Sequence, residues 1–323
     1  MIANSGEYRK KNGQRGYVMM NNFIFENKTK VYFGKGGVKE YLGGLLANSG
    51  ETIMLAYGGG SIKCNGVYDE IMGILNAQGK CVVEFSGIMS NPTYAKVQDG
   101  AKLAHENHVD LILAVGGGSV SDCCKVISGA FDTLSHAMET YFGKPDENNL
   151  SDDINEAVMR SVIRNIRILL TDPENYDARS ELAWASAMAE NGILKIGKVT
   201  DFQCHMIEHQ LGAYTNCNHG AGLAVIHPVL YRHIYKSGTA RFTRWAQNVW
   251  GIAPKGSDEE TAAAGIDALA AFIKEIGLLT TFTELGIPAD TDFHAVADST
   301  NITAGCCKKL TRDEICEILQ EYL

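Results

Sequence analysis

Four side chains in two short segments could together bind a metal ion. Asp132 and His136 stand four residues apart in GAFDTLSHAMETYF, so a helix there places both on one face. His205 and His219 flank the polar break TNCN, and two helices joined by a short turn would bring them close together. One carboxylate and three imidazoles suit a divalent first-row metal with room for a substrate oxygen. A buried salt bridge is the alternative explanation for the first pair.

A second histidine spacing indicates a different kind of metal site. His205 and His209 stand four residues apart, as the two histidines of the zinc-protease motif HExxH do. Position 206 is Met rather than Glu, so the general base of that mechanism is missing. A metalloprotease is therefore disfavoured.

Two apolar runs, each expected to be a buried strand, end in the same tetrapeptide GGGS, at residues 58–61 and 116–119. Glycines at the carboxyl end of a parallel strand let backbone amides approach a phosphate closely. A tight structural turn could explain one such sequence, but two of them favour nucleotide binding. Neither fits GxGxxG, and the absence of GxxxxGK[ST] disfavours kinases and ATPases built on that loop.

The residues after the first glycine turn bear on the choice of cofactor. An acidic residue usually binds the free ribose 2′-hydroxyl of NAD. Here Ser61, Ile62 and Lys63 follow the glycines, and no acid occurs before Asp69. Small polar residues and a lysine suit a 2′-phosphate better, which favours NADP(H) over NAD(H).

Hydrophobic patterning predicts two domains of different classes. Before residue 128, apolar strands at 30–34, 52–57, 80–87 and 110–115 alternate with helices at 66–79 and 93–108, as in a parallel, helix-covered sheet. After residue 150 the spacing is helical throughout, for example at 151–170, 178–195 and 311–323. We therefore expect a disordered tail at 1–20, a dinucleotide-binding domain at 21–128 and a helical metal-binding domain at 129–323.

Composition excludes several classes of partner. The 323-residue chain has a net charge of −9 and no basic stripe, which argues against nucleic acid. No run of eighteen apolar residues could cross a membrane. The nine cysteines form no CxxC pair and are expected to be reduced thiols in a cytoplasmic protein.

The chain resembles the iron-containing alcohol dehydrogenases, in particular their butanol dehydrogenase and NADPH-dependent aldehyde reductase branch. The resemblance rests on NFIFENKTKVYFGKG, YGGGSIKCNGVYDEI, SNPTYAKV, LAVGGGSVSDCCKVI, GAFDTLSHAMETYF and HMIEHQLGAYTNCNHGAGLAV. It implies a dehydroquinate-synthase-like fold, in which an α/β Rossmann-like parallel-sheet domain precedes an all-helical domain. The active site is expected in the cleft between them.

The resemblance also implies a role for particular residues. The expected metal ligands are Asp132, His136, His205 and His219, with His209 as the catalytic histidine beside the nicotinamide. The expected cofactor-binding residues are Gly59, Gly60, Ser61, Gly117, Gly118, Ser119 and Asp122. The implied metal is Fe(2+), with Zn(2+) also compatible, and the implied substrates are small aldehydes or alcohols. A homodimer that involves the strand at 30–34 is expected.

One departure from the family pattern affects the activity expected of this chain. Family members carry a substantial segment between the GGGSxxDxxK helix and the DxxxH helix, whereas here several dozen residues are missing near Ser128–Gly129. Two functions stay open: a metal-dependent, NAD(P)H-linked oxidoreductase, and a catalytically impaired family member that binds metal or nucleotide without hydride transfer. The two GGGS turns argue against a metal-binding interaction protein without nucleotide.

Overall fold

The structure is a computed structural model that describes residues 24–88, 94–116, 123–144, 149–302 and 307–321, with the backbone alone for 123–128. The chain divides into two compact units, Asn27–Val126 and Ile127–Leu323, the latter together with the residues up to Glu26. The tail predicted at 1–20 lies outside the described residues. No helix in the described part of the chain is both long enough and apolar enough to cross a membrane.

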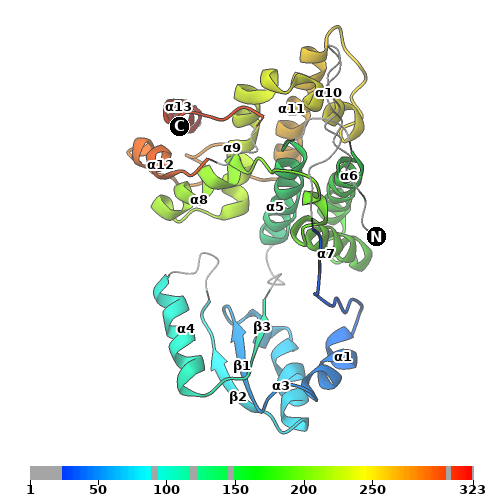
Figure 1. Cartoon of the computed structure of the whole chain (residues 1–323), viewed down its shortest axis with the longest axis vertical. Helices are drawn as coiled ribbons and strands as arrows, with labels where there is room; N and C mark the ends of the chain where they lie inside the picture. The colour runs from blue at the N-terminus through cyan, green and yellow to red at the C-terminus, as the bar shows by residue number, and fades with distance from the viewer. Residues whose placement is uncertain (1–23, 89–93, 117–122, 145–148, 303–306, 322–323) are drawn as a thin grey trace, which may run out of the picture. The chain divides into compact units, whose positions relative to one another are not determined.

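The first unit is built on a three-stranded parallel sheet (Figure 1). Its strands are β1 (Thr52–Tyr57), β2 (Cys81–Phe85) and β3 (Leu111–Val115), in the order β2-β1-β3. Ile53 of the central strand pairs with Val82 on one side and with Leu111 on the other. The sequence prediction of a parallel sheet is confirmed.

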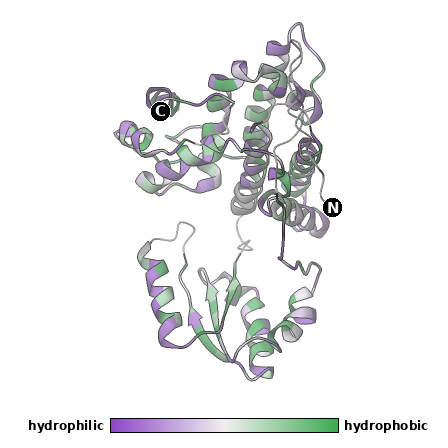
Figure 2. Ribbon diagram, viewed as in Figure 1, coloured by the Kyte–Doolittle hydropathy of each residue, from purple (hydrophilic) through white to green (hydrophobic). Residues whose placement is uncertain are grey.

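Helices surround this sheet because its central strand is apolar on both faces. They are α1 (Gly37–Leu46), α2 (Ser61–Cys64), α3 (Val67–Ala77) and α4 (Tyr94–Glu106). Ile53 and Leu55 share one core with Leu75 of α3, and β1 carries the hydrophobic colour in Figure 2. Helix α4 packs closely on β2, since a Cβ on Gly100 would lie 2.9 Å from the Phe85 ring.

The strand predicted at 30–34 does not form, so that prediction is wrong. Residues 24–33 have no regular secondary structure, and the described sheet contains only the three strands named above. A strand needs a neighbour for its backbone hydrogen bonds, and apolar alternation alone does not provide one. Val31, Tyr32 and Phe33 are 56%, 46% and 54% exposed.

The second unit is helical, as predicted. Its elements are α5 (Cys123–Tyr141), α6 (Leu150–Thr171), α7 (Tyr176–Glu190), η1 (Ile193–Lys195), α8 (Gln203–Thr215), α9 (His219–Ile234), η2 (Tyr235–Ser237), α10 (Thr239–Asn248), α11 (Asp258–Glu275), α12 (Phe293–Ser299) and α13 (Arg312–Gln320). Between residues 149 and 302 and between 307 and 321, the only extended pairing is one antiparallel bridge from Val199 to Lys144. Helix α5 runs without interruption through positions 128 and 129.

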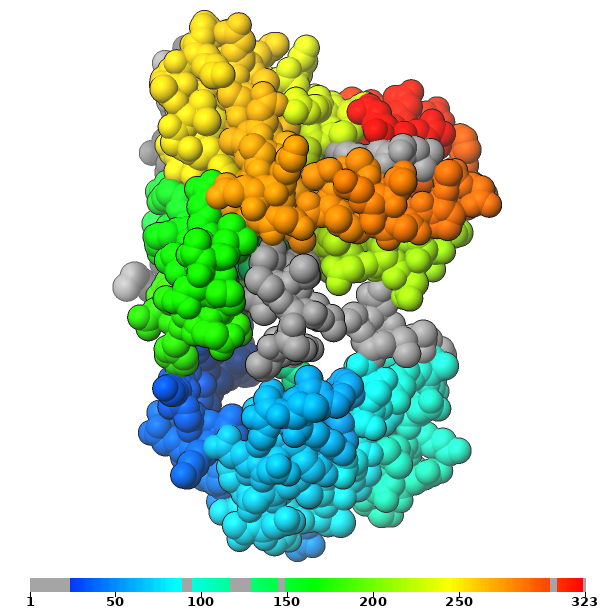
Figure 3. Space-filling model, turned by 180° about the vertical axis from the view of Figure 1, so that it is seen from behind, coloured from blue at the N-terminus to red at the C-terminus, as the bar shows by residue number. Residues whose placement is uncertain are grey.

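Aromatic rings at the end of α5 hold the helices of this unit together. Phe142 stacks on Phe242 of α10 with ring centroids 4.0 Å apart, and Tyr231 of α9 and Trp245 of α10 pack edge-on against it. Helix α6 lies against α7, and α10 lies against α11 (Figures 1 and 3). This packing fixes α5 and α9, which carry most of the site described next.

Candidate metal centre

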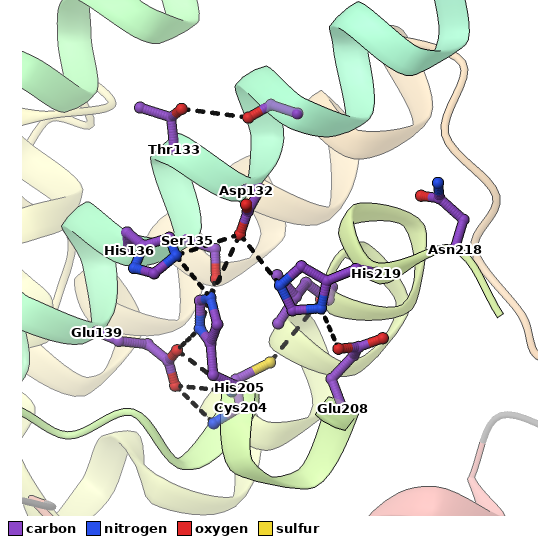
Figure 4. Close-up of polar contacts among 12 residues, drawn as sticks. Asp132, Thr133, Ser135, His136, Glu139, Cys204, His205, Glu208, Asn218 and His219 are labelled. Atoms are coloured by element: carbon purple, nitrogen blue, oxygen red, sulfur yellow. Dashed lines mark hydrogen bonds and ion pairs between the residues drawn. The ribbon is translucent and has the colours of Figure 1, made fainter. Parts of the chain in front are cut away.

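One face of α5 presents a row of ionisable side chains. Asp132, His136 and Glu139 stand at positions i, i+4 and i+7, so they follow one another along the helix. Phe131, Leu134 and Met138 of the same helix are fully buried. The apolar residues anchor the helix in the core, and the polar row faces α8 and α9 (Figure 4).

A helical hairpin supplies the remaining histidines, as the sequence predicted. His205 lies on α8, and His219 is the first residue of α9. Asn216 ends α8 in the left-handed conformation, and the Asn218 side chain accepts a hydrogen bond from the Ala221 amide at 3.0 Å. This N-cap fixes the start of α9 and thereby the position of His219.

Asp132 is the common neighbour of the three predicted histidine ligands (Figure 4). Asp132 Oδ1 lies 3.6 Å from Nε2 of His136, 3.3 Å from Nε2 of His205 and 3.5 Å from Nε2 of His219. The Nε2 atoms of His136 and His205 are 3.1 Å apart. Asp132, His205 and His219 offer donor atoms that all lie within 4.8 Å of one another, a grouping that could hold one metal ion. His136 joins this group through its contacts with Asp132 and His205.

Two buried glutamates orient the histidines of α8 and α9. Glu139 contacts Nδ1 of His205, and Glu208 contacts Nδ1 of His219. A histidine that donates its Nδ1–H to a carboxylate keeps Nε2 free for a metal, so these pairs set the tautomer that the site needs. A Cβ on Gly222 would lie 2.9 Å from Glu208 Oε1, so the glycine leaves space for this carboxylate.

Sequence reasoning missed both glutamates, although the sequence holds a signal for them. Glu139 follows His136 by three residues, and Glu208 follows His205 by three residues. On a helix this spacing places each carboxylate on the same face as a candidate ligand. A search for partners of the histidine Nδ1 atoms would have found them.

The charges in this cluster stabilise a cation. Burial opposes ionisation of Asp132, but hydrogen bonds with His205 and His219 outweigh it and hold the pKa of this carboxyl well below its usual range. Burial would lower the pKa of both histidines. The charge of Glu139 and the hydrogen bond with Asp132 instead raise the pKa of His205 to about 9. Hydrogen bonds with Asp132 and Glu208 raise the pKa of His219 to about 10.

The expected catalytic histidine lies next to the cluster but makes different contacts. The His209 ring stacks on His219 with centroids 5.2 Å apart and meets His205 edge-on at 5.8 Å. Partial burial and the neighbouring charges of His219 and His205 lower the pKa of His209. It is therefore neutral at neutral pH and able to accept a proton.

A further carboxylate reaches the cluster from α7. Glu190 Oε1 lies 2.9 Å from Nε2 of His136. Nδ1 of His136 is buried and has no hydrogen-bond partner among the described residues. The spacing of Asp132 and His136 gave no indication of Glu190, which is 54 positions from His136 in the sequence.

The first glycine turn, in the other unit, is open. Gly59 and Gly60 follow β1, and a Cβ on either would meet no atom within 4 Å. Ser61 begins the short helix α2. Backbone amides in such a turn are accessible to a phosphate. The other predicted cofactor residues, Gly117, Gly118, Ser119 and Asp122, lie outside the described residues.

The structure adds an acidic neighbour to Lys63 that sequence spacing did not reveal. The Lys63 ammonium lies 3.6 Å from Glu84 Oε2 and 4.5 Å from the centre of the Tyr68 ring. Tyr57 and Tyr68 both donate hydrogen bonds to Glu84, at 2.6 and 2.7 Å. The charge of Lys63 is thus partly balanced by the carboxylate of Glu84, which lies on β2.

Comparison with known proteins shows one family along both units. Residues 28–157 match the description "iron-containing alcohol dehydrogenase", and residues 126–323 match "Fe-containing alcohol dehydrogenase family, C-terminal". NADH-dependent butanol dehydrogenase A of Clostridium acetobutylicum is 28% identical, with 94% of this chain and 100% of the relative covered. The NADPH-dependent aldehyde reductase YqhD of Escherichia coli is 27% identical, with 83% and 90% covered.

Solved structures agree with this similarity. The crystal structure of NADH-dependent butanol dehydrogenase A from Thermotoga maritima has a TM-score of 0.87 at 26% identity, covering 94% of this chain and 99% of that chain. The cofactor-free YqhD structure has a TM-score of 0.81 at 25% identity, with 94% and 100% covered. These similarities support the two-part architecture of a parallel sheet followed by helices.

The alignments also show that this chain is shorter than its relatives. The match to the Clostridium protein spans 389 residues, whereas 94% of the 323 residues here is about 304. About 85 positions of that relative therefore have no counterpart in this chain. Since the relative is covered from end to end, much of this shortfall is internal.

Proposed function

The chain belongs to the iron-containing alcohol dehydrogenase family, and from this premise we propose which of its residues perform the chemistry. As a family member it is an oxidoreductase that interconverts alcohols and aldehydes with a nicotinamide cofactor. We propose that Asp132, His136, His205 and His219 hold its metal ion, and that small primary alcohols and aldehydes are its substrates. The printed names of its relatives, butanol dehydrogenases and an aldehyde reductase, support that substrate class.

The observation that carries this proposal is the convergence of three Nε2 atoms on one carboxylate oxygen, at 3.3 to 3.6 Å. When bound there, the metal supplies Lewis-acid polarisation of the substrate oxygen. Glu139 and Glu208 hold His205 and His219 in the tautomer that points Nε2 toward Asp132. The resident metal is Fe(2+) in this proposal, and the same donors also accept Zn(2+).

His209 is proposed as the group that moves the proton. Its lowered pKa leaves the imidazole neutral, so a ring nitrogen can take the proton that an alcohol loses and return it when an aldehyde is reduced. Its ring lies against His219, one of the proposed ligands, and so remains close to the reacting oxygen.

We further propose that the cofactor is NADP(H) and that Lys63 contributes to this preference. The contact with Glu84 partly neutralises Lys63 and weakens its attraction for a 2′-phosphate. Lys63→Ala should therefore raise the KM for NADPH more than the KM for NADH. Glu84→Gln should have the opposite effect and lower the KM for NADPH relative to the KM for NADH. Equal changes for both cofactors would show that Lys63 does not contact the 2′-phosphate.

The missing internal positions favour a second candidate function, that of a family member that binds metal or nucleotide without transferring hydride. About 85 residues of the Clostridium relative have no counterpart here. Purified protein loaded with Fe(2+) or Zn(2+) should oxidise NADPH when butanal is added. Metal binding with no NADPH oxidation above that of the His209→Ala variant would support the second candidate.

The assembly and location proposed for the chain rest on other observations. Val31, Tyr32 and Phe33 form an exposed apolar run in an extended segment, which is suited to pairing in a homodimer. The described cysteines 64, 81, 204, 217, 307 and 316 are not joined in disulfides, which supports a reducing, cytoplasmic location. Fractionation of the producing cells would test the location.

A further inference from the structure

We propose that Glu190 is a fifth protein ligand of the metal, in addition to the three histidines and Asp132. This inference rests on the proposed function, because it assumes that those four residues hold a cation. It concerns a side chain that no spacing pattern in the sequence singles out.

The position of Glu190 is fixed by a helix, since the residue belongs to the last turn of α7 and not to a loop. It is the last residue of α7, and Gly192 with φ of +86° turns the chain immediately afterwards. The Glu190 side chain is 51% exposed, whereas that of His136 is 17% exposed. Glu190 is therefore more accessible to solvent than the histidine that it contacts.

The contact between Glu190 and His136 is short enough for two ligands of one ion. Glu190 Oε1 lies 2.9 Å from Nε2 of His136, the same nitrogen that lies 3.6 Å from Asp132 and 3.1 Å from His205. Ligand bonds of about 2.0–2.2 Å place two donors at a right angle about 3 Å apart. A metal on this nitrogen removes its proton, so Glu190 can no longer accept a hydrogen bond there and faces the ion instead.

His136 is also the histidine with the least support from its other nitrogen. Nδ1 of His205 and Nδ1 of His219 each contact a glutamate, whereas Nδ1 of His136 has no partner among the described residues. Metal-binding histidines are normally fixed through the second nitrogen. Glu190 contacts the opposite nitrogen, Nε2, so it does not replace this support, and its carboxylate lies at the atom that faces Asp132.

A fifth ligand raises the coordination number of the metal and the number of carboxylates among its ligands. Glu190 adds a second carboxylate to a ligand set that otherwise consists of Asp132 and three imidazoles. Structural zinc sites are almost always four-coordinate, whereas carboxylate-rich sites suit iron and manganese. Glu190 should therefore shift the metal preference from Zn(2+) toward Fe(2+) and Mn(2+).

The test compares metal binding in Glu190→Gln and Glu190→Ala with that of the unmodified full-length protein. Glu181→Gln is the matched control, since Glu181 is on the same helix and is exposed, with only a 3.5 Å contact to Ser161. Fe(2+) and Co(2+) affinities are measured by competition with a chelator, and the Co(2+) protein is examined by visible absorption. Because Glu190 is half exposed, both variants should keep the thermal stability of the metal-free protein.

We expect both Glu190 variants to bind Fe(2+) and Co(2+) at least about 10-fold more weakly. Their Co(2+) absorption should become stronger, as is typical of a lower coordination number, and Glu181→Gln should match the unmodified protein. Unchanged affinity and an unchanged spectrum in both variants would overturn the role of Glu190 while leaving the four-ligand site intact. Absence of metal from the unmodified protein would overturn both proposals together.

Discussion

At the scale of single residues, each histidine proposed as a metal ligand contacts a glutamate from another turn or another helix. Glu139 contacts His205, Glu208 contacts His219, and Glu190 contacts His136. The first two act on Nδ1 and orient the ring, whereas the third acts on Nε2, the atom that faces Asp132. The glutamates thus differ in role although all three lie against imidazoles.

Replacement of Glu208 tests the orienting role. Glu208→Ala removes the acceptor from Nδ1 of His219, so the ring can rotate or adopt the other tautomer. We expect metal affinity to fall about 10- to 100-fold, as measured by chelator competition. Glu208→Gln keeps an acceptor oxygen, so its metal affinity should fall less than that of Glu208→Ala. An alanine variant that binds as tightly as the unmodified protein would contradict the role of this pair.

The raised pKa values of two proposed ligands predict how metal binding depends on pH. With pKa values of about 9 and about 10, His205 and His219 are both protonated at neutral pH in the metal-free protein. A metal binds neutral imidazole, so it must displace these protons and its affinity must rise with pH until about 9–10. Two released protons correspond to about 100-fold per pH unit.

Calorimetric titration in buffers of different ionisation enthalpy measures the protons released. Close to two protons per metal should leave at neutral pH. A value near zero would show that His205 and His219 are already neutral and that the surrounding carboxylates do not hold protons on them.

The sequence predicts part of this site because helical spacing is local. Asp132 and His136 share a helix face at any position in the fold, and the polar break between His205 and His219 predicts a hairpin. Glu190 could not be found in this way. Its place depends on where α7 ends and on how that helix packs, which no local pattern encodes.

At the scale of elements, sequence patterns predicted a helix or strand correctly where the signal lay within the segment itself. The segments predicted at 52–57 and 66–79 became β1 and α3. The strand predicted at 30–34 failed because the described sheet provides no neighbour for it. The helix predicted over 178–195 ends at Glu190 because Gly192 adopts a left-handed conformation that interrupts it.

The start of α6 carries a buried ionic network that should dominate the stability of the helical unit. Asp152 is fully buried, contacts Lys198 and lies 2.7 Å from Nη1 of Arg241. Removal of one partner leaves a buried charge without compensation, so Asp152→Asn should lower the free energy of unfolding by about 3–5 kcal/mol.

Chemical denaturation measures this loss, and the neighbouring residue supplies the control. Asp153 is 64% exposed and pairs with Arg244 on the surface. Asp153→Asn should cost about 0–1 kcal/mol. Equal losses in the two variants would mean that the network around Asp152 does not stabilise the unit as a buried ion pair does.

At the scale of the whole molecule, family identity extends over both units although the chain is shorter than its relatives. The two family matches overlap between residues 126 and 157, and α5 passes through this stretch as one helix. All the proposed metal ligands follow residue 131, and the family pattern predicts the missing segment before them, near Ser128–Gly129. The metal centre can therefore form in a chain whose turnover depends on what the missing positions contribute.

The exposed apolar segment predicts the state of assembly. Val31→Asp places a charge in the run proposed to pair with a second copy, and it should shift the protein from dimer to monomer in light-scattering measurements. Val97→Asp on α4 is the matched control, because both valines are 56% exposed. A monomeric unmodified protein, or a dimer that survives Val31→Asp, would contradict this interface.

Elemental analysis of the purified full-length protein after loading with Fe(2+) or Zn(2+) tests the central claim most directly. We expect about one ion per chain, because three histidine Nε2 atoms lie within 3.6 Å of one Asp132 oxygen, and a large loss of metal in folded Asp132→Ala and His219→Ala variants. A folded protein that retains no transition metal after any loading, or variants that retain it fully, would contradict the account.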